Sequence, residues 1–350
     1  MKSSLNSPIR LLSIAAALAA SGVSGVVHAE GITMYGVADV YAEYGKGDRN
    51  EVSVNSGGVS GSRLGFDASK DIGGGTKAVA KLEAGYGIDH GNSTQGGLLF
   101  GRQAYVGLSG DWGTLTAGRQ YTPQFIAIDS NDPFDTGAGS AASSGIFSMF
   151  ASRANNSIAY SSNTMGGFQF SALAAAGESS SGSNTNGSLL EANFHFGSGP
   201  FGADLTLSGM KRTADDGKNA TAETLGGYYD LGAVKILGAV QLVQNSTMAP
   251  DTDDNRTEFM AGVNVPFGND VLWLGAGAGK TNKVHGSTAS QYSVGYMHNI
   301  VKGVDVYGVA TTIKNGDGTA YSDDTATGAG PAVSAGKSAS ALQVGFRYRF

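Results

Sequence analysis

The chain has 350 residues, with 23 basic residues, 29 acidic residues and no cysteine, and its formal net charge is −6. The acidic balance argues against general nucleic-acid binding, and the lack of cysteine excludes disulfides, thiolate chemistry and zinc-finger sites. Glycine accounts for 55 residues, more than twice its average share of about 7%. It is spread along the chain, which disfavours collagen, flexible linkers and helix-rich folds.

The start of the chain has the pattern of an export signal. Lys2 and Arg10 precede a short apolar run, and small residues follow within Val27–Ala29. The apolar run is too short for a membrane-spanning helix. We therefore expect a signal peptide at residues 1–29 and a mature domain at 30–350. Without Lys2 and Arg10, 21 basic residues face 29 acidic ones, so the mature net charge is −8.

The mature chain opens with an alternation of period two. Apolar residues such as Val40 share one face, and polar residues such as Asp39 and Glu43 share the other, as in a half-buried strand. After a polar loop expected from Lys46 to Gly61, the same rhythm recurs along the chain. We predict sixteen strands, near residues 32–45, 63–69, 77–88, 102–109, 114–120, 153–162, 168–178, 189–196, 201–212, 224–231, 233–244, 257–265, 271–282, 289–298, 304–314 and 338–350.

The predicted connections alternate between tight turns and long polar loops. Met165–Gly167 is a short connection, whereas residues 178–188, 245–256 and 315–338 are long and rich in Ser, Thr, Asp and Gly. An even strand number with short turns at one end is typical of an outer-membrane barrel, because closure leaves no unpaired edge in lipid. A soluble β-sandwich has the same period. The strand number and loop asymmetry favour an all-β fold, a sixteen-stranded antiparallel transmembrane β-barrel.

The last strand favours the barrel as well. Its residues, Leu342 to Phe350, read LQVGFRYRF, which places Leu, Val, Phe, Tyr and Phe on one face and Gln343, Gly345, Arg347 and Arg349 on the other. Aromatic residues at strand ends fit the interfacial girdles of membrane barrels.

Several motifs together resemble the general porins of Gram-negative bacteria, particularly the β-proteobacterial type. They are the terminal strand ending in Phe350, and the segments MYGVADVY, GSRLGF, GRQAYVGLSG and TAGRQYTP. The resemblance covers nearly the whole mature chain. It implies a homotrimeric barrel in the outer membrane, with lipid and lipopolysaccharide around it. It also implies that the third long loop folds inward and that Phe350 is a signal for outer-membrane assembly.

The segment from Tyr121 to Ser152 is the candidate for that inward loop. It has two prolines, three aspartates and little strand or helix periodicity, and loops of this length are usually functional. The resemblance implies that it bends into the pore, where Asp129, Asp132 and Asp135 would supply acidic groups. From the residues alone, a loop that caps the outside of the barrel remains equally open.

The wall opposite this loop is expected to be basic. Strand parity turns Arg63 and Arg153 inward, Arg153 because it is expected to share a face with Asn155 and Ser157. Parity also makes Lys81 and Glu83 candidate pore-lining residues. The orientation of two further arginines is ambiguous. Arg102 matches the family pattern but shares parity with the outward Ala104 unless a bulge intervenes, and Arg119 has the same conflict. Each of these charges could also be a solvated wall residue without effect on permeation.

The expected function is passive diffusion of small hydrophilic solutes and ions through a water-filled channel. Guanidinium groups facing a carboxylate loop would create a transverse field and concentrate anions, so we expect a weak anion preference. No metal, cofactor, nucleic-acid partner or enzymatic activity is expected.

Two motifs look like other sites. Leu274–Thr281 reads LGAGAGKT, but a phosphate-binding loop requires glycine where Leu274 stands, and the glycines alternate along a predicted strand. The acidic residues of 251–255 lack the glycine and the glutamate of a calcium loop, so a solvated acidic loop is the simpler interpretation. Loosely held divalent cations or bridging to lipopolysaccharide are the alternative.

Two rival functions remain open at this point. A lipase-like barrel enzyme would need Ser and His within hydrogen-bond reach, and no mature histidine lies in a recognisable nucleophile motif. An adhesin or receptor barrel would bind a partner through its long outer loops.

Overall fold

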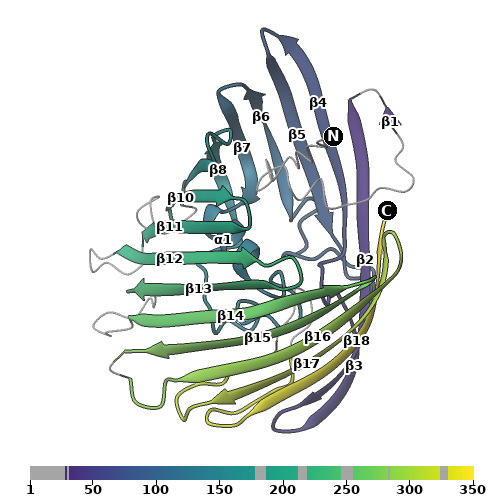
Figure 1. Cartoon of the computed structure of the whole chain (residues 1–350), viewed down its shortest axis with the longest axis vertical. Coiled ribbons are helices and arrows are strands. Elements are labelled where there is room, and N and C mark those ends of the chain that lie inside the picture. Colours follow the sequence, from purple (N-terminus) through teal and green to yellow (C-terminus); the bar gives the residue numbers. More distant parts are fainter. Residues whose placement is uncertain are drawn as a thin grey trace, which may run out of the picture.

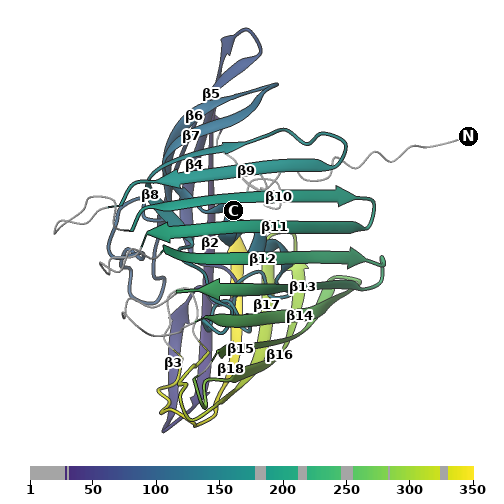
Figure 2. The same ribbon diagram turned by 90° about the vertical axis from the view of Figure 1, so that its left-hand side faces the viewer.

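The strands form one closed antiparallel sheet. The computed structural model describes residues 28–29, 31–177, 187–211, 219–245, 255–282, 284–323 and 330–350. Successive strands pair along the chain, and the last strand pairs with β2, so that the sheet closes on itself (Figures 1 and 2). The signal-peptide prediction for 1–29 lies outside the described residues, apart from 28–29.

The strand segments follow the predicted rhythm. In chain order they are β1 His28–Ala29, β2 Ile32–Lys46, β3 Asn50–Ser56, β4 Arg63–Gly73, β5 Thr76–Gly85, β6 Gln103–Gly110, β7 Gly113–Tyr121, β8 Arg153–Ser161, β9 Phe168–Ala175, β10 Leu189–Ser198, β11 Phe201–Lys211, β12 Asn219–Asp230, β13 Lys235–Gln244, β14 Arg256–Phe267, β15 Asp270–Thr281, β16 Ala289–Val301, β17 Val304–Asn315 and β18 Ala339–Arg349. The motif LGAGAGKT therefore lies in β15, as the sequence predicted.

Eighteen segments make sixteen barrel strands. Among the described residues, β1 adds two residues beside β2, while β3 and β4 are two parts of one interrupted strand. Both pair with β2: β3 with Val40–Lys46 and β4 with Ile32–Val37. The predicted polar loop from Lys46 to Gly61 was therefore wrong in its middle. Its Val52 and Val54 alternate with polar residues, but the strand is short and mostly polar.

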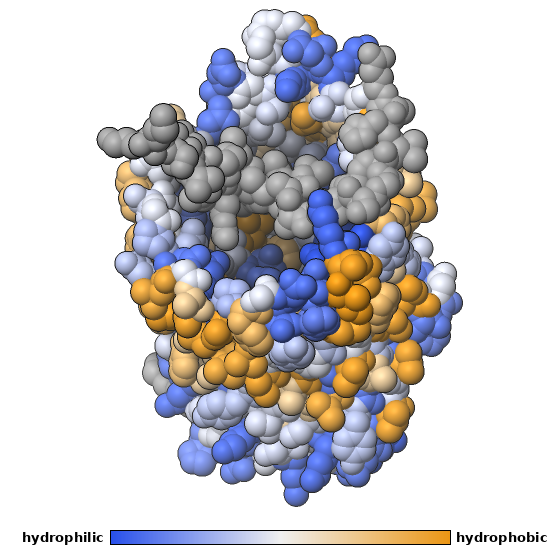
Figure 3. Space-filling model, turned by 45° about the vertical axis from the view of Figure 1, so that its right-hand side comes forward, coloured by the Kyte–Doolittle hydropathy of each residue, from blue (hydrophilic) through white to orange (hydrophobic). Residues whose placement is uncertain are grey.

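Alternation along each strand separates an inner from an outer face. In β18, Leu342 and Val344 are 53% and 62% exposed, whereas Gln343 between them is fully buried. Arg347 is also buried on the inner face, as parity predicted. The outer apolar side chains gather in a band across the surface, with more hydrophilic regions on either side (Figure 3). A band of this kind matches the hydrocarbon layer of a bilayer.

Tight turns at one end require glycine. Between β4 and β5, Gly73, Gly74 and Gly75 have φ values of 91°, 61° and 72°, a backbone region that other residues rarely adopt. Helical structure is a minor component, and within the described residues no helix is long and apolar enough to cross a membrane.

Candidate functional site

The long connection between β7 and β8 begins with a helix. The hydroxyl of Thr122 accepts a hydrogen bond from the backbone N–H of Phe125 at 3.1 Å, and Pro123 occupies the first turn. Helix α1 then runs Pro123–Asn131. The expectation of little helix periodicity was wrong for these nine residues. Their apolar side chains lie on several sides of the helix, so the period that marks an amphipathic helix is weak.

Helix α1 is attached to the inner faces of the wall strands. The backbone N–H of Gln124 donates to Glu191 Oε2 at 2.8 Å, and the amide of Asn131 donates to Asp204 Oδ2 at 2.9 Å. Glu191 and Asp204 are buried inner-face residues of β10 and β11. The helix therefore lies inside the ring of strands, where Figure 1 shows it behind β10–β12.

The tip of the loop, residues 132–140, packs against β15. The rings of Phe134 and Trp273 lie 5.9 Å apart between centroids. A Cβ atom at Gly275 would lie 2.7 Å from the Phe134 ring, so only glycine admits the loop this close to the wall. Ala138 is completely buried in the same cluster.

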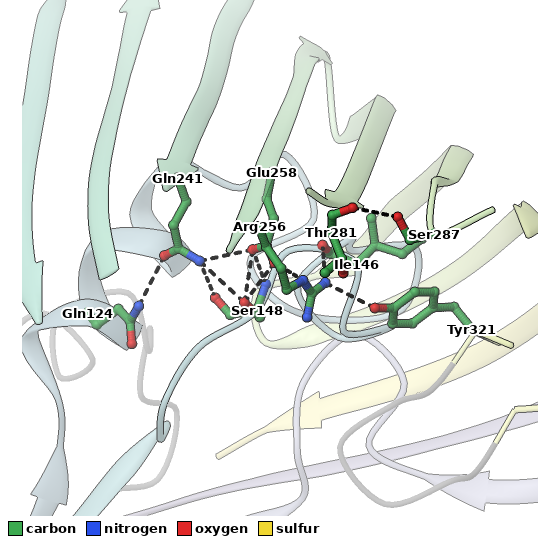
Figure 4. Close-up of polar contacts among 9 residues, drawn as sticks. All are labelled: Gln124, Ile146, Ser148, Gln241, Arg256, Glu258, Thr281, Ser287 and Tyr321. Carbon is green, nitrogen blue, oxygen red and sulfur yellow. Dashed lines mark hydrogen bonds and ion pairs between the residues drawn. The ribbon is translucent and has the colours of Figure 1, made fainter. Parts of the chain in front are cut away.

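The returning half of the loop is anchored by a polar network, shown in Figure 4. Glu258 of β14 accepts hydrogen bonds from the backbone N–H of Ser148 at 2.7 Å and from the amide of Gln241 at 2.9 Å. It also forms an ion pair with Arg256, whose Nε lies 2.8 Å from its Oε1. Gln124 of α1 donates to Gln241 at 3.0 Å. Both halves of the loop are thus joined to one patch of wall.

A basic group gathers where the loop leaves β7 and enters β8. Arg102 Nε lies 2.9 Å from Glu83 Oε1, and its Nη2 donates to the Tyr121 hydroxyl at 2.5 Å. Arg153 donates to the same hydroxyl at 2.8 Å, with its guanidinium 4.4 Å from the Tyr121 ring centroid. Tyr35 donates to the other oxygen of Glu83 at 2.6 Å. Two guanidiniums therefore share one phenol, and one carboxylate pairs with one of them.

Arg63 and Lys81 lie on neighbouring strands of the same wall. Arg63 is half-buried, and its Nε has no hydrogen-bond partner within the part of the chain that the structure describes. Lys81 Nζ lies 3.3 Å from Asp67 Oδ1, and the side chain is 1% exposed. Lys81 and Glu83 both lie on the inner face of β5, as strand parity predicted.

The three loop aspartates have different environments. The Thr136 hydroxyl donates to Asp129 Oδ1 at 2.6 Å. Burial raises the pKa of Asp129, while this hydrogen bond and the charges of Arg63 and Arg102 act to lower it. Asp132 accepts hydrogen bonds from the Phe134 N–H and from Ser140, and it is buried inside the loop. The structure therefore leaves only part of the predicted acidic set at the lumen surface.

Asp135 is the exposed member of that set. It has a left-handed backbone with φ of 48°, and its side chain is open to solvent. Its carboxyl lies in the field of Asp129 and Asp132 from the loop and of Lys235 and Arg347 from the wall.

Arg102 and Arg119, whose orientation was ambiguous from the sequence, lie in different surroundings. Arg102 precedes β6, so the parity of Ala104 does not apply, and its side chain is buried beside Glu83. Arg119 of β7 pairs with Ala104 of β6, on the outer face of the sheet. There it donates to the Gly101 carbonyl at 2.7 Å and to Asn155 Oδ1 at 2.6 Å.

The prediction that strand parity turns Arg153 inward rested on a wrong premise. It assumed that Asn155 and Ser157 share one face, but the register of β7 and β8 shifts between Gly118 and Gln120, and Asn156 has φ of 48°. Ser157 is buried, whereas Asn155 is exposed. Arg153 reaches the basic group through Tyr121 instead.

Comparison with known proteins identifies the architecture. A family model for the Gram-negative porins matches residues 15–318. The chain belongs to the Gram-negative porin family. Outer membrane porin protein 32 of Delftia acidovorans is 31% identical, over 95% of this chain and 98% of that protein. The chitoporin of Vibrio furnissii is 29% identical, over 84% of each chain.

The fold of this porin matches that of a solved relative. An anion-selective porin from Comamonas acidovorans superposes with a TM-score of 0.80 at 28% identity, covering 91% of this chain and 99% of that one. The predicted family and the sixteen-stranded barrel are confirmed. This porin is an outer-membrane channel for the passive diffusion of small hydrophilic solutes and ions.

Several residues of the interior were missed by the sequence analysis. Glu191 and Glu258 anchor the loop, and Asp305 pairs with Arg347 at 2.8 Å and with Arg349 at 3.1 Å. Strand parity could have turned all of these inward. It could not say which of them meet the loop, because the contacts of Glu191 and Glu258 join residues 67 and 110 positions apart. The acidic loop of 251–255 lies outside the described residues except for Asn255.

Proposed function

We propose that the loop from Tyr121 to Ser152 forms the constriction of this porin and that Arg63, Arg102 and Arg153 form its basic wall. Support comes from the attachment of the loop to the inner faces of β10, β11 and β14. The positive charges of Arg63 and Arg102 act on the carboxyl of Asp129 in the loop, which supports a transverse arrangement of charge across the lumen.

The channel prefers anions in this proposal. The observation that carries it is the sharing of the Tyr121 hydroxyl by Arg102 and Arg153, because Glu83 neutralises only one of these guanidiniums. Guanidinium groups stay charged at any relevant pH. The description of the Comamonas acidovorans relative as anion-selective gives further support.

Three acidic residues of the wall form ion pairs with basic side chains. Asp305 is paired with two arginines, Asp67 lies beside Lys81, and Glu258 lies beside Arg256. These three carboxylates therefore add little net negative charge to the lumen. The proposal treats the chain as a channel rather than an enzyme, without a cofactor, because its family is a channel family.

Single-channel recording tests the proposed function. The refolded mature protein should give stepwise open currents in a planar bilayer, and a potassium chloride gradient should give a reversal potential of the sign for anion preference. A clear cation preference would contradict the proposed basic wall. A folded barrel without conductance would contradict the open channel itself and return attention to the receptor and enzyme alternatives.

Anion preference should depend on pH. Desolvation raises the pKa of Asp132 to about 6 and that of Asp135 to about 7, and it also raises the pKa of Asp129. A raised pKa in a carboxyl means that protonation, and so loss of negative charge, occurs as the pH falls from 8 to 5. We expect the reversal potential to move further toward anion preference over this range. Asp132→Asn together with Asp135→Asn should weaken the pH dependence, and an unchanged response in that double variant would contradict this assignment.

Assembly is the remaining part of the proposal. Residues 1–29 would be removed on export, and the mature chain would form a homotrimer within lipid and lipopolysaccharide. Phe350 would serve as the assembly signal. Its backbone pairs with Gly36 by two hydrogen bonds of 2.9 and 3.0 Å, so this end of the chain completes the seam between β18 and β2. The mass of the native protein in detergent distinguishes a trimer from a monomer.

A further inference from the structure

A second segment leaves the wall for the lumen, between β3 and β4. On the neighbouring strand β2, Val40 pairs with Ser56 and Val37 pairs with Arg63. Two residues of β2 therefore lie opposite six residues, Gly57–Ser62. An ordinary bulge adds a single residue. The four extra residues here form a short inner loop, which we call the inner segment.

Asp39 of β2 holds the inner segment. Its carboxylate accepts the N–H of Gly58 at 3.1 Å, the N–H of Ser60 at 2.9 Å and the hydroxyl of Tyr307 at 2.5 Å. Ser62 Oγ accepts a hydrogen bond from the Asp39 N–H and donates one to the Asp39 carbonyl, both at 3.0 Å. Asp39 is completely buried. This buried carboxylate fixes the backbone around it, because removal of the carboxylate would leave each of its donors without a hydrogen-bond partner.

The inner segment touches the tip of the constriction loop. Val59 belongs to the same buried cluster as Phe134 and Ala138. The N–H of Ala138 donates to the Gly58 carbonyl at 2.9 Å. A Cβ atom at Gly137 would lie 2.8 Å from the Val59 carbonyl oxygen, so the two backbones are in close contact.

The same segment is joined to the basic side of the lumen. Arg347 donates to Ser60 Oγ at 3.0 Å. Arg63 follows the segment directly and begins β4. The position of the loop tip and the position of Arg63 are thus set by one short stretch of backbone.

We propose that the inner segment is a positioning element of the channel, which holds the tip of the constriction loop open against the wall through Asp39. This inference rests on the proposed role of the loop from Tyr121 to Ser152. Release of the inner segment frees residues 132–140 to move into the lumen. The consequence is more frequent closure of the channel rather than loss of the barrel.

The test uses reversible cross-linking in the full mature chain. Asp39→Ala should increase the frequency of channel closures by roughly ten-fold, because hydrogen bonds to a buried charge are lost. The chain has no native cysteine, so Val59→Cys with Ala138→Cys can form only one disulfide. Oxidation of this pair in the Asp39→Ala background should restore the wild-type closure frequency, and reduction should abolish the rescue.

The cysteine pair in the wild-type background is the matched control, and oxidised it should behave as the wild type. A merely structural role of Asp39 would lower barrel stability without redox-dependent rescue. If Asp39→Ala does not fold, Tyr307→Phe and Gly58→Ala decide the question. Tyr307→Phe removes one donor, and a Cβ atom at Gly58 would lie 2.2 Å from the Tyr307 hydroxyl.

The outcomes separate this inference from the proposed function. Unchanged closures in folded Asp39→Ala, or in both Tyr307→Phe and Gly58→Ala, would overturn the positioning role, as would failure of the oxidised pair to rescue. The basic wall is tested independently, because Arg63→Ala plus Arg153→Ala is measured by ion selectivity and not by closure frequency.

Discussion

Replacement of Arg63 and Arg153 by alanine is expected to shift the channel from anion toward cation preference. In the proposed basic wall, the charge of Arg63 acts on Asp129 and Arg153 lies against Tyr121, and neither arginine has a carboxylate within salt-bridge distance in the described part of the chain. Loss of Arg63 leaves Asp129 with less opposing positive charge, and loss of both arginines removes two positive charges from the proposed basic wall.

The expected size follows from Coulomb's law. At an effective dielectric constant of about 20, one unit charge about 8 Å from a permeating ion contributes about 2 kcal/mol before screening by salt. After screening, we expect the ratio of anion to cation permeability to fall by roughly ten-fold, which corresponds to about 1.4 kcal/mol. The measurement is the reversal potential in a salt gradient, recorded from single channels.

A charge-matched control separates local from overall effects. Arg49 lies in the connection between β2 and β3, and Lys70 lies in the second half of β4; both are exposed, and Arg49→Ala with Lys70→Ala removes the same total charge. The control should keep the wild-type reversal potential. Equal shifts in the two double variants would show that net charge, and not the basic wall, governs selectivity.

Glu258→Ala is expected to loosen the loop and to lower the stability of the barrel. Glu258 is completely buried and joins Ser148 of the loop to Gln241 and Arg256 of the wall. Removal of one partner from a buried ion pair typically costs about 3–5 kcal/mol, because the other charge stays buried. Among the described residues, Arg256 would keep hydrogen bonds only to Tyr321 and the Ile146 carbonyl, which are neutral.

Thermal unfolding of the folded barrel, followed by circular dichroism, measures this effect. Glu258→Gln should lose less stability than Glu258→Ala, because the amide oxygen still accepts the Ser148 N–H. Glu223 is an exposed glutamate of β12, and Glu223→Ala should change the free energy of unfolding by less than about 0.5 kcal/mol. Unfolding of Glu258→Ala at the wild-type temperature would mean that this network does not hold the loop.

The strands and their faces were predictable because alternation of side chains is a local property of the backbone. Lys81, Glu83 and Arg347 were assigned to the inner face by parity alone, and the structure places them there. Parity failed where the backbone departs from a regular strand. Arg102 precedes its strand, and a register shift separates Arg153 from Ser157.

The sequence by itself determined a closed membrane barrel, since an apolar face and a polar face repeat with period two along sixteen strands and no edge can remain in lipid. Only the tertiary structure decided which inner residues meet. Asp39 and Tyr307 are 268 positions apart, and Ser148 and Glu258 are 110 apart. Such contacts depend on closure of the whole ring and on the path of a loop without regular period, and neither leaves a local signal in the residues that it joins.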